Sequence, residues 1–326
     1  MSIALFFPGQ GSQRPGMLQH LPSTPTAAKA WSQARRTLRS LTGVPATLDT
    51  REALESTTNA QLALLIAGVV SARALVDDQG LEVDFVAGHS IGAFAAAVLA
   101  GVLNLGDALR VVQVRGEEMQ RACRDRDWGM AALGGLRLSS VRSLLNNVAT
   151  TDDPLWVANI NSADQIVISG TQAALDALHQ RAAAAGAREM NILDVSVASH
   201  CPLQVDTARA VADALRRVTH GDQRRAYLTN TTGRRVLNAP EKVIDDLAQA
   251  VRQPVQWYDA TRLMAELGVT VAIETPPGHV LTAIAARAIP DVQCFAADEI
   301  GIGASVRRAR ALHGWGASPA TDYAFT

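Results

Sequence analysis

One stretch of the chain, residues 83–99, reads VDFVAGHSIGAFAAAVL. It begins with a short apolar run, which indicates a buried strand, and from about residue 91 it continues as an alanine-rich run that indicates a helix. The pentapeptide Gly-His-Ser-Ile-Gly, residues 88–92, lies between the two and predicts a tight turn. A strand, a tight turn and a helix in succession are typical of an α/β protein, and we predict that fold class.

The pentapeptide fits the pattern G-x-S-x-G, which alone is weakly specific because glycine and serine are common residues. Its place between a strand and a helix is more informative, because a serine on such a turn presents an exposed hydroxyl. The N-terminus of the following helix would also favour an oxyanion that develops there. We interpret Ser90 as a nucleophile; a helix N-cap serine without a catalytic task is the alternative.

A serine nucleophile needs a base, and two histidines are candidates. His89 adjoins Ser90, but a side chain next to the serine on such a turn points elsewhere, which favours a structural role. His200 follows shortly after residues 128–195, which we expect to form a small subdomain inserted in a larger domain. A histidine at the point where the chain returns to the larger domain could reach a site between the two. An ordinary loop histidine is the alternative for His200.

Arg115 is the most informative charged residue. On the helix expected over residues 107–122, apolar side chains recur at a spacing that places Arg115 on their face. A buried guanidinium needs an anionic partner. That partner is either a structural Asp or Glu, or the carboxylate of a substrate, which the arginine fork binds well.

The loop Gly9-Gln10-Gly11 follows the first expected strand, residues 3–7. Flanking glycines let a backbone approach a ligand closely, and an N–H group here could complete an oxyanion hole. A flexible turn is the alternative interpretation.

Residues 128–195 differ in pattern from the sequence on either side. They predict a strand, a helix, two strands, a helix and a strand, which is the order of a ferredoxin-like module. We expect this small subdomain to be inserted in a large α/β-hydrolase-like domain with a parallel sheet, residues 1–127 and 196–313. Residues 314–326 are expected to form a loosely ordered tail.

Composition narrows the class of protein. Thirty basic side chains against thirty-one acidic ones produce no overall field that would recruit nucleic acid or an anionic membrane. The three cysteines lack metal-ligand spacing, so no metal site is expected and a reducing compartment is indicated. No signal peptide is visible, and the apolar segment 93–105 is too short to span a bilayer. We expect a soluble, cytoplasmic protein.

Several motifs, taken in order, resemble those of the malonyl-CoA:acyl-carrier-protein transacylases. The resemblance runs from residue 3 to about residue 290. An ordered set of this kind is far more specific than one motif alone. It consists of GQGSQ (9–13), GHSIG (88–92), QVRG (113–116), SVASHC (196–201), PVQW (254–257) and ETPPGHVLT (274–282).

The resemblance implies a role for each candidate residue. Ser90 would be the nucleophile, His200 its base and Arg115 the clamp on the free malonyl carboxylate, and the backbone N–H groups of Gln10 and Ile91 would form the oxyanion hole. The reaction would be ping-pong: malonyl-CoA acylates the serine, coenzyme A leaves, and a phosphopantetheine-type thiol of a carrier protein attacks. No bound cofactor is implied.

Within this family, residues 6–17, 88–98 and 274–282 look most like the malonyltransferase (epsilon) subunit of bacterial malonate decarboxylase. Ala93 stands where the fatty-acid-synthesis enzymes usually carry an acidic residue. The implied partners are the carrier protein of the decarboxylase, docked transiently by a monomer, and other subunits of that complex. A malonyl transacylase of fatty acid synthesis is the alternative. The family orients its histidine with a backbone carbonyl at the position of Ala250, commonly Gln or Asn, and we leave the orienting residue open.

Two other classes compete with this interpretation. A serine esterase of the α/β-hydrolase type could use Ser90, Asp194 and His200, but such partners usually lie on separate loops, and the esterase leaves Arg115 without a task. The other class is a docking subunit that has lost turnover. It is not favoured, because a candidate nucleophile and a candidate base are both present.

Overall fold

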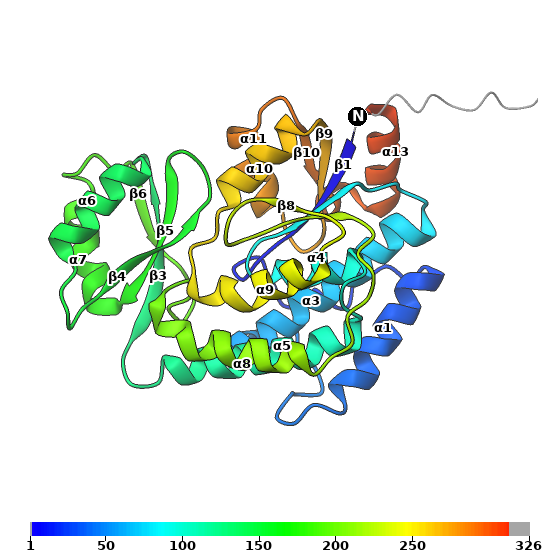
Figure 1. Cartoon of the computed structure of the whole chain (residues 1–326), viewed down its shortest axis with the longest axis horizontal. Coiled ribbons are helices and arrows are strands. Elements are labelled where there is room, and N and C mark those ends of the chain that lie inside the picture. The colour runs from blue at the N-terminus through cyan, green and yellow to red at the C-terminus, as the bar shows by residue number, and fades with distance from the viewer. Residues whose placement is uncertain (1, 313–326) are drawn as a thin grey trace, which may run out of the picture.

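The computed structural model describes residues 2–312, which form an α/β fold with one mostly parallel sheet and a second, small antiparallel sheet (Figure 1). In the larger sheet the strand order is β10-β9-β1-β2-β7-β8, and only β8 runs antiparallel to its neighbour. Its strands are β1 (Ser2–Phe7), β2 (Phe85–Gly88), β7 (Ala226–Leu228), β8 (Arg235–Val236), β9 (Val269–Glu274) and β10 (Gln293–Ala296).

Both faces of the larger sheet are covered, which is why β1 is a continuous apolar run rather than an alternating one. Ile3, Leu5 and Phe7 belong to the core on one face, whereas Ala4 and Phe6 belong to the core on the other. The sequence predicted neither β8, which at two residues is too short to show a pattern of its own, nor the four-residue strand β10.

Helices surround this sheet on both faces (Figure 1). Residues of α3, α4, α5, α8 and α9 belong to the core on one face, and residues of α10 and α11 to the core on the other. The helices are α1 (Pro25–Leu38), α2 (Arg51–Leu54), α3 (Thr57–Arg73), the π-helix η1 (Ala74–Asp78), α4 (Gly92–Leu99), α5 (Leu105–Ala122), the 3-10 helix η2 (Pro202–Gln204), α8 (Val205–Arg216), α9 (Pro240–Gln249), the 3-10 helix η3 (Ala250–Arg252), α10 (Trp257–Glu266), α11 (Val280–Ala288), α12 (Ala297–Ile300) and α13 (Ile302–Leu312).

The small sheet comprises β3 (Trp128–Gly134), β4 (Leu155–Ile160), β5 (Gln165–Thr171) and β6 (Glu189–Ile192), paired antiparallel in the order β4-β5-β3-β6. With α6 (Leu138–Val148) and α7 (Gln172–Ala182), its elements follow each other in the β-α-β-β-α-β order expected from the sequence. The boundaries of the two domains and the closer likeness to α/β-hydrolases stay predictions. The predicted tail, residues 314–326, lies outside the described residues.

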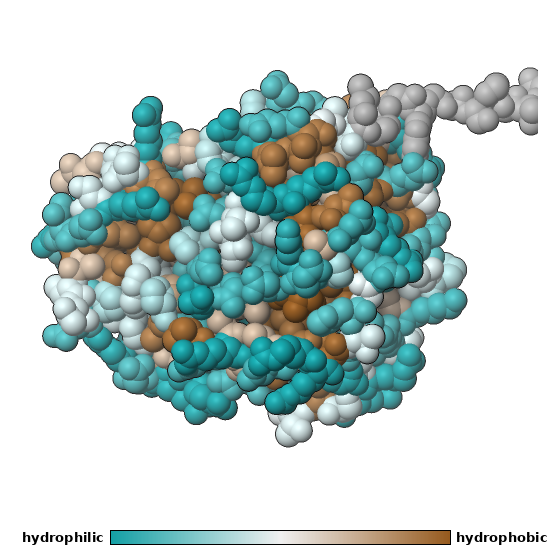
Figure 2. All heavy atoms as spheres, in the orientation of Figure 1, coloured by the Kyte–Doolittle hydropathy of each residue, from teal (hydrophilic) through white to brown (hydrophobic). Residues whose placement is uncertain are grey.

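One helical stretch, Thr57–Asp78, is long and apolar enough to cross a membrane by length and composition. Of its most apolar window, 83% is buried inside the protein, which is typical of a core helix. The sequence reading of 93–105 as the most apolar segment overlooked this longer one. Figure 2 shows hydrophilic residues over most of the visible face, with the apolar residues in separate patches.

Candidate active site

The turn between β2 and α4 requires glycine at both of its ends. A Cβ atom on Gly88 would lie 2.1 Å from the carbonyl oxygen of Gly92, and one on Gly92 would lie 2.1 Å from that of Phe7. Between them Ser90 has a φ of +54°, in the left-handed region that few non-glycine residues adopt. The close packing of strand and helix therefore forces the serine into a strained backbone conformation, as in a nucleophile elbow.

The side chain of Ser90 faces His200 rather than the helix N-terminus. Its Oγ lies 2.8 Å from Nε2 of His200, and the N-cap residue of α4 is Ile91. The alternative of a helix N-cap serine does not fit this geometry. The structure thus brings together two residues 110 positions apart in the chain.

A backbone carbonyl orients His200. Nδ1 lies 2.6 Å from the carbonyl oxygen of Ala250, and the backbone N–H of His200 donates to the carbonyl of Val251 at 2.7 Å. Because a carbonyl only accepts, Nδ1 carries the proton and Nε2 is free to accept from Ser90. Ala250 therefore occupies the orienting position that the sequence left open. Burial and the nearby charge of Arg115 lower the pKa of His200 to about 3, so the ring is neutral at neutral pH.

This arrangement contradicts the serine esterase triad. Asp194 is exposed, and Nδ1 of His200 is already bound to the carbonyl of Ala250. Among the described residues, the ring nitrogens of His200 contact Ala250 and Ser90, and no hydrogen bond or ion pair joins the ring to Asp194. Asp194 therefore has no part in the site.

Arg115 lies on α5 with only 2% of its surface exposed. Its Nη1 donates to Oε1 of Gln61 at 2.6 Å and its Nη2 to Oγ of Ser90 at 3.1 Å. Burial lowers the pKa of the guanidinium to about 10, which still leaves it charged at neutral pH. Among residues 2–312, none of the ion pairs includes Arg115. The described residues therefore provide no structural Asp or Glu as a partner, which was one alternative, and the cation faces the candidate nucleophile Ser90.

The N–H groups of Gln10 and Ile91 are candidates for an oxyanion hole. Over the described range no protein acceptor takes either of them, whereas Oδ1 of Asn230 takes the N–H of Ser90 at 2.9 Å. The loop of Gln10 packs on the elbow through Gly9, where a Cβ would lie 2.8 Å from the carbonyl oxygen of His89. Both N–H groups are therefore free of protein acceptors, as donors of an oxyanion hole need to be.

The side chain of His89 points away from Ser90 and contacts residues of the small sheet. Its Nε2 lies 3.0 Å from Oδ1 of Asn161 and 3.1 Å from Nδ2 of Asn159, and its ring packs edge-on against Trp257. These contacts join the elbow to β4 and to the loop that follows it. They agree with a structural role for His89.

Sequence reasoning missed Gln61, Asn230 and the buried Asp246. Gln61 is fully buried on α3 and is the one polar residue between Ala60 and Val70, which is a signal that could have been used. Asn230 and Asp246 lie in segments without a recognisable motif. No pattern in the sequence places either of them at the elbow.

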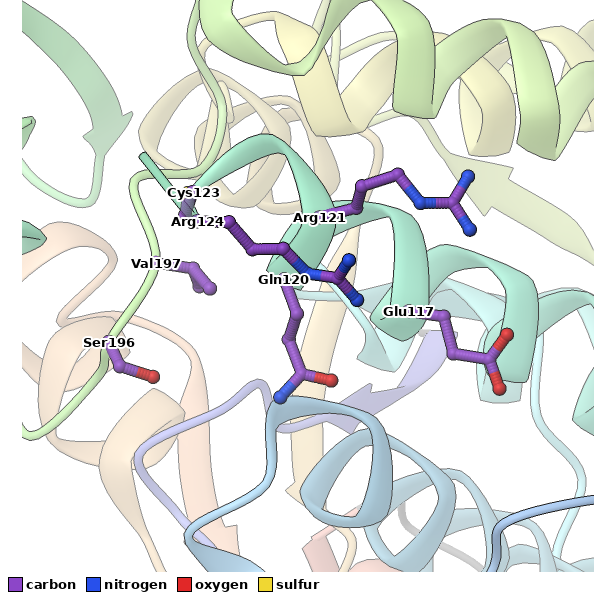
Figure 3. A pocket seen from close by; sticks show the side chains of 7 residues that line it. All are labelled: Glu117, Gln120, Arg121, Cys123, Arg124, Ser196 and Val197. Carbon is purple, nitrogen blue, oxygen red and sulfur yellow. The ribbon is translucent and has the colours of Figure 1, made fainter. Parts of the chain in front are cut away.

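A pocket of about 450 Å³ lies beside the site (Figure 3). It is formed by the C-terminal end of α5 and by the segment that leads to His200. Figure 3 shows Gln120 and Arg124 extending from the end of α5, with Ser196 and Val197 on the segment opposite. Neither Arg115 nor His200 is among the residues that line the pocket. The lining residues are Glu117, Gln120, Arg121, Cys123, Arg124, Ser196 and Val197.

Comparison with known proteins relates this geometry to a family. Residues 5–306 match the family model described as "Acyl transferase domain". The malonyl CoA-acyl carrier protein transacylase of Escherichia coli strain K12 is 32% identical over 298 residues, covering 91% of this chain and 96% of the relative. That of Bacillus subtilis strain 168 is 31% identical over 283 residues, covering 86% and 89%.

Solved structures agree with these relatives. The malonyl CoA-acyl carrier protein transacylase from Coxiella burnetii superposes with a TM-score of 0.86 at 29% identity and covers 96% of this chain and 98% of its own. A malonyl-transacylase in complex with a type II PKS acyl-carrier protein superposes with a TM-score of 0.82 at 30% identity, covering 96% and 100%.

Proposed function

Because the chain belongs to the acyl transferase domain family and is therefore an acyltransferase, we propose that it carries malonyl groups from coenzyme A to an acyl carrier protein through an ester on Ser90. One observation carries the proposal furthest. A buried guanidinium, that of Arg115, lies 3.1 Å from the candidate nucleophile and has no acidic partner among the described residues. A thioester that carries its own carboxylate would supply that partner.

In the first half-reaction His200 takes the proton of Ser90 as the serine Oγ attacks the thioester carbonyl. The N–H groups of Gln10 and Ile91 hold the oxyanion of the tetrahedral intermediate. When the carbon–sulfur bond breaks, His200 returns the proton to the leaving sulfur, coenzyme A departs, and the malonyl group remains as an ester.

In the second half-reaction the thiol of a carrier-bound phosphopantetheine group attacks the ester. His200 now takes the thiol proton and returns it to the departing Oγ of Ser90, so that the enzyme is regenerated. The tautomer held by Ala250 suits both steps, because Nε2 accepts a proton in each attack and donates it in each departure.

Arg115 also couples substrate choice to the base. Its charge is one cause of the lowered pKa of His200. A bound carboxylate that neutralises the guanidinium would remove that repulsion and make His200 a stronger base. An acetyl thioester would leave the guanidinium unpaired and the base weak, so both effects favour malonyl over acetyl.

The kind of carrier protein separates two branches. By their names, the relatives and structures described above act on acyl carrier protein, which favours the fatty-acid-synthesis alternative over the malonate decarboxylase role. We therefore propose an ordinary phosphopantetheine carrier as acceptor. The test is to offer the purified malonyl-enzyme either a holo acyl carrier protein or a carrier with a dephospho-CoA-type group. The malonyl group should transfer faster to the holo acyl carrier protein; faster transfer to the other carrier would favour the decarboxylase role.

Intact mass spectrometry after brief mixing with malonyl-CoA tests the proposal. The wild type should gain one malonyl group, Ser90→Ala none, and holo acyl carrier protein should remove the adduct. Ser139→Ala, which removes an exposed hydroxyl on α6, is the matched control and should acylate like the wild type. A folded wild type that takes up no malonyl group would rule the proposal out.

A further inference from the structure

A single buried asparagine bridges the two sides of the elbow. Asn230 follows β7, is 3% exposed, and accepts the N–H of Ser90 through Oδ1 at 2.9 Å. Its Nδ2 donates to the carbonyl of Gly88 at 2.8 Å. The strained backbone of Ser90 persists only where its surroundings hold it, and this amide binds the residue itself and the end of the strand that leads to it.

A buried carboxylate holds Asn230 in turn. Asp246 lies on α9, is 2% exposed, and accepts the backbone N–H of Asn230 at 2.9 Å. The same carboxylate accepts the hydroxyl of Tyr227 at 2.8 Å and both the N–H and the hydroxyl of Thr231, at 2.9 and 2.7 Å. These hydrogen bonds fix the loop after β7 to one point on α9.

The C-terminal end of α9 also reaches the base. The next residue after α9 is Ala250, whose carbonyl accepts Nδ1 of His200, and Val251 accepts its backbone N–H. Asp246 precedes Ala250 by one helical turn. One helix and its short continuation thus contact the nucleophile through Asn230 and the base directly.

We propose that Asn230 and Asp246 are positioning residues, and that α9 sets the distance between Ser90 and His200. The inference rests on the proposed roles of that pair. Asn230 also decides which elbow amide serves the oxyanion: it occupies the N–H of Ser90 and leaves that of Ile91 open. None of the hydrogen bonds of Asn230 or Asp246 involves Arg115, so we expect binding of the malonyl carboxylate to be independent of them.

The Asn230 side chain accepts one hydrogen bond, from Ser90, and donates the other, to Gly88, and this difference allows the positioning role to be tested. An ionised aspartate at this position can accept from Ser90 but cannot donate to Gly88, whereas a protonated one can do both. Asn230→Asp should therefore acylate slowly at pH 8 and recover as the pH falls toward 5. The titratable groups around this position are Tyr227, Asp246, His89 and, across Ser90, His200 and Arg115. The wild-type profile shows their combined contribution.

Rapid-quench measurement of Ser90 acylation by malonyl-CoA gives the readout. Asn230→Ala should acylate about 10- to 100-fold more slowly at saturation, with little change in the concentration needed for half saturation, because reacting atoms displaced by about 1 Å cost that much. Leu178→Ala is the control. Leu178 is buried on α7, in the core beside the small sheet, so its truncation should lower the melting temperature without changing any contact of the elbow.

The outcomes separate this inference from the proposed function. No acylation of the wild type would refute the function. Normal acylation of the wild type together with a wild-type rate in folded Asn230→Ala would refute the positioning role alone. An equal loss in Asn230→Ala and Leu178→Ala, or no recovery of Asn230→Asp at low pH, would show that Asn230 acts only through stability.

Discussion

Replacing Arg115 should change which acyl group the enzyme accepts. The guanidinium is 2% exposed and charged, and its fork can offer a substrate carboxylate two charge-assisted hydrogen bonds. At about 1.5–3 kcal/mol each, their loss amounts to about 3–6 kcal/mol. With a factor of ten for every ~1.4 kcal/mol, Arg115→Ala should lower kcat/KM for malonyl-CoA by roughly 10²- to 10⁴-fold. Acetyl transfer should be unchanged or faster, since a buried charge without a partner is removed.

The assay compares malonyl-CoA and acetyl-CoA as donors to one holo acyl carrier protein, with kcat/KM measured for each. Arg110→Ala is the matched control, because Arg110 lies on the same helix but is exposed and pairs only with Asp107. Arg115→Lys keeps the charge without the fork, so its preference for malonyl should fall between those of the wild type and Arg115→Ala. An unchanged ratio of malonyl to acetyl in a folded Arg115→Ala protein would refute the clamp.

Two further predictions concern pH. Burial and the charge of Arg115 lower the pKa of His200 to about 3, so kcat/KM for malonyl-CoA should not change between about pH 5 and pH 8. An inflection of kcat/KM near pH 6.5 in the wild type would contradict the assignment of a buried neutral base. Burial by itself would raise the pKa of Asp78, but hydrogen bonds from Thr24, Thr26 and Ala27 at the start of α1 outweigh it and lower the pKa to about 2. A carboxylate with a lowered pKa stabilises the fold at pH values above its pKa in the unfolded chain, so this contribution should be lost as the pH falls from about 4 to 2. Asp78→Asn should therefore have a lower melting temperature than the wild type at pH 7, and a melting temperature that depends less on pH in the acid range. If the melting temperatures of the two proteins change in parallel from pH 7 to pH 2, the ionisation of Asp78 contributes nothing to stability.

The elbow and the small sheet could be predicted because their signals are local. Gly88 lies two residues before Ser90 and Gly92 two residues after it. Both positions need glycine, because a strand–turn–helix unit brings backbone atoms too close there for a Cβ atom. The β-α-β-β-α-β order of residues 128–195 is likewise encoded segment by segment, in the periodicity of each strand and helix. The buried face of α5 placed Arg115 correctly for the same reason.

What the sequence by itself determined, then, is the class of fold, the serine on the tight turn that is the candidate nucleophile, and the buried cation. Only the tertiary structure decided their partners. Ser90 meets Asn230 across 140 residues and Arg115 meets Gln61 across 54, and no local pattern specifies a contact over such a separation. The orienting group of His200 shows the limit most clearly: it is a backbone carbonyl, present at every residue, so the side chain of Ala250 carries no sign of it. The carbonyl of Ala250 orients His200 because α9 ends next to the ring, and the position of that helix end depends on how α9 packs in the large domain.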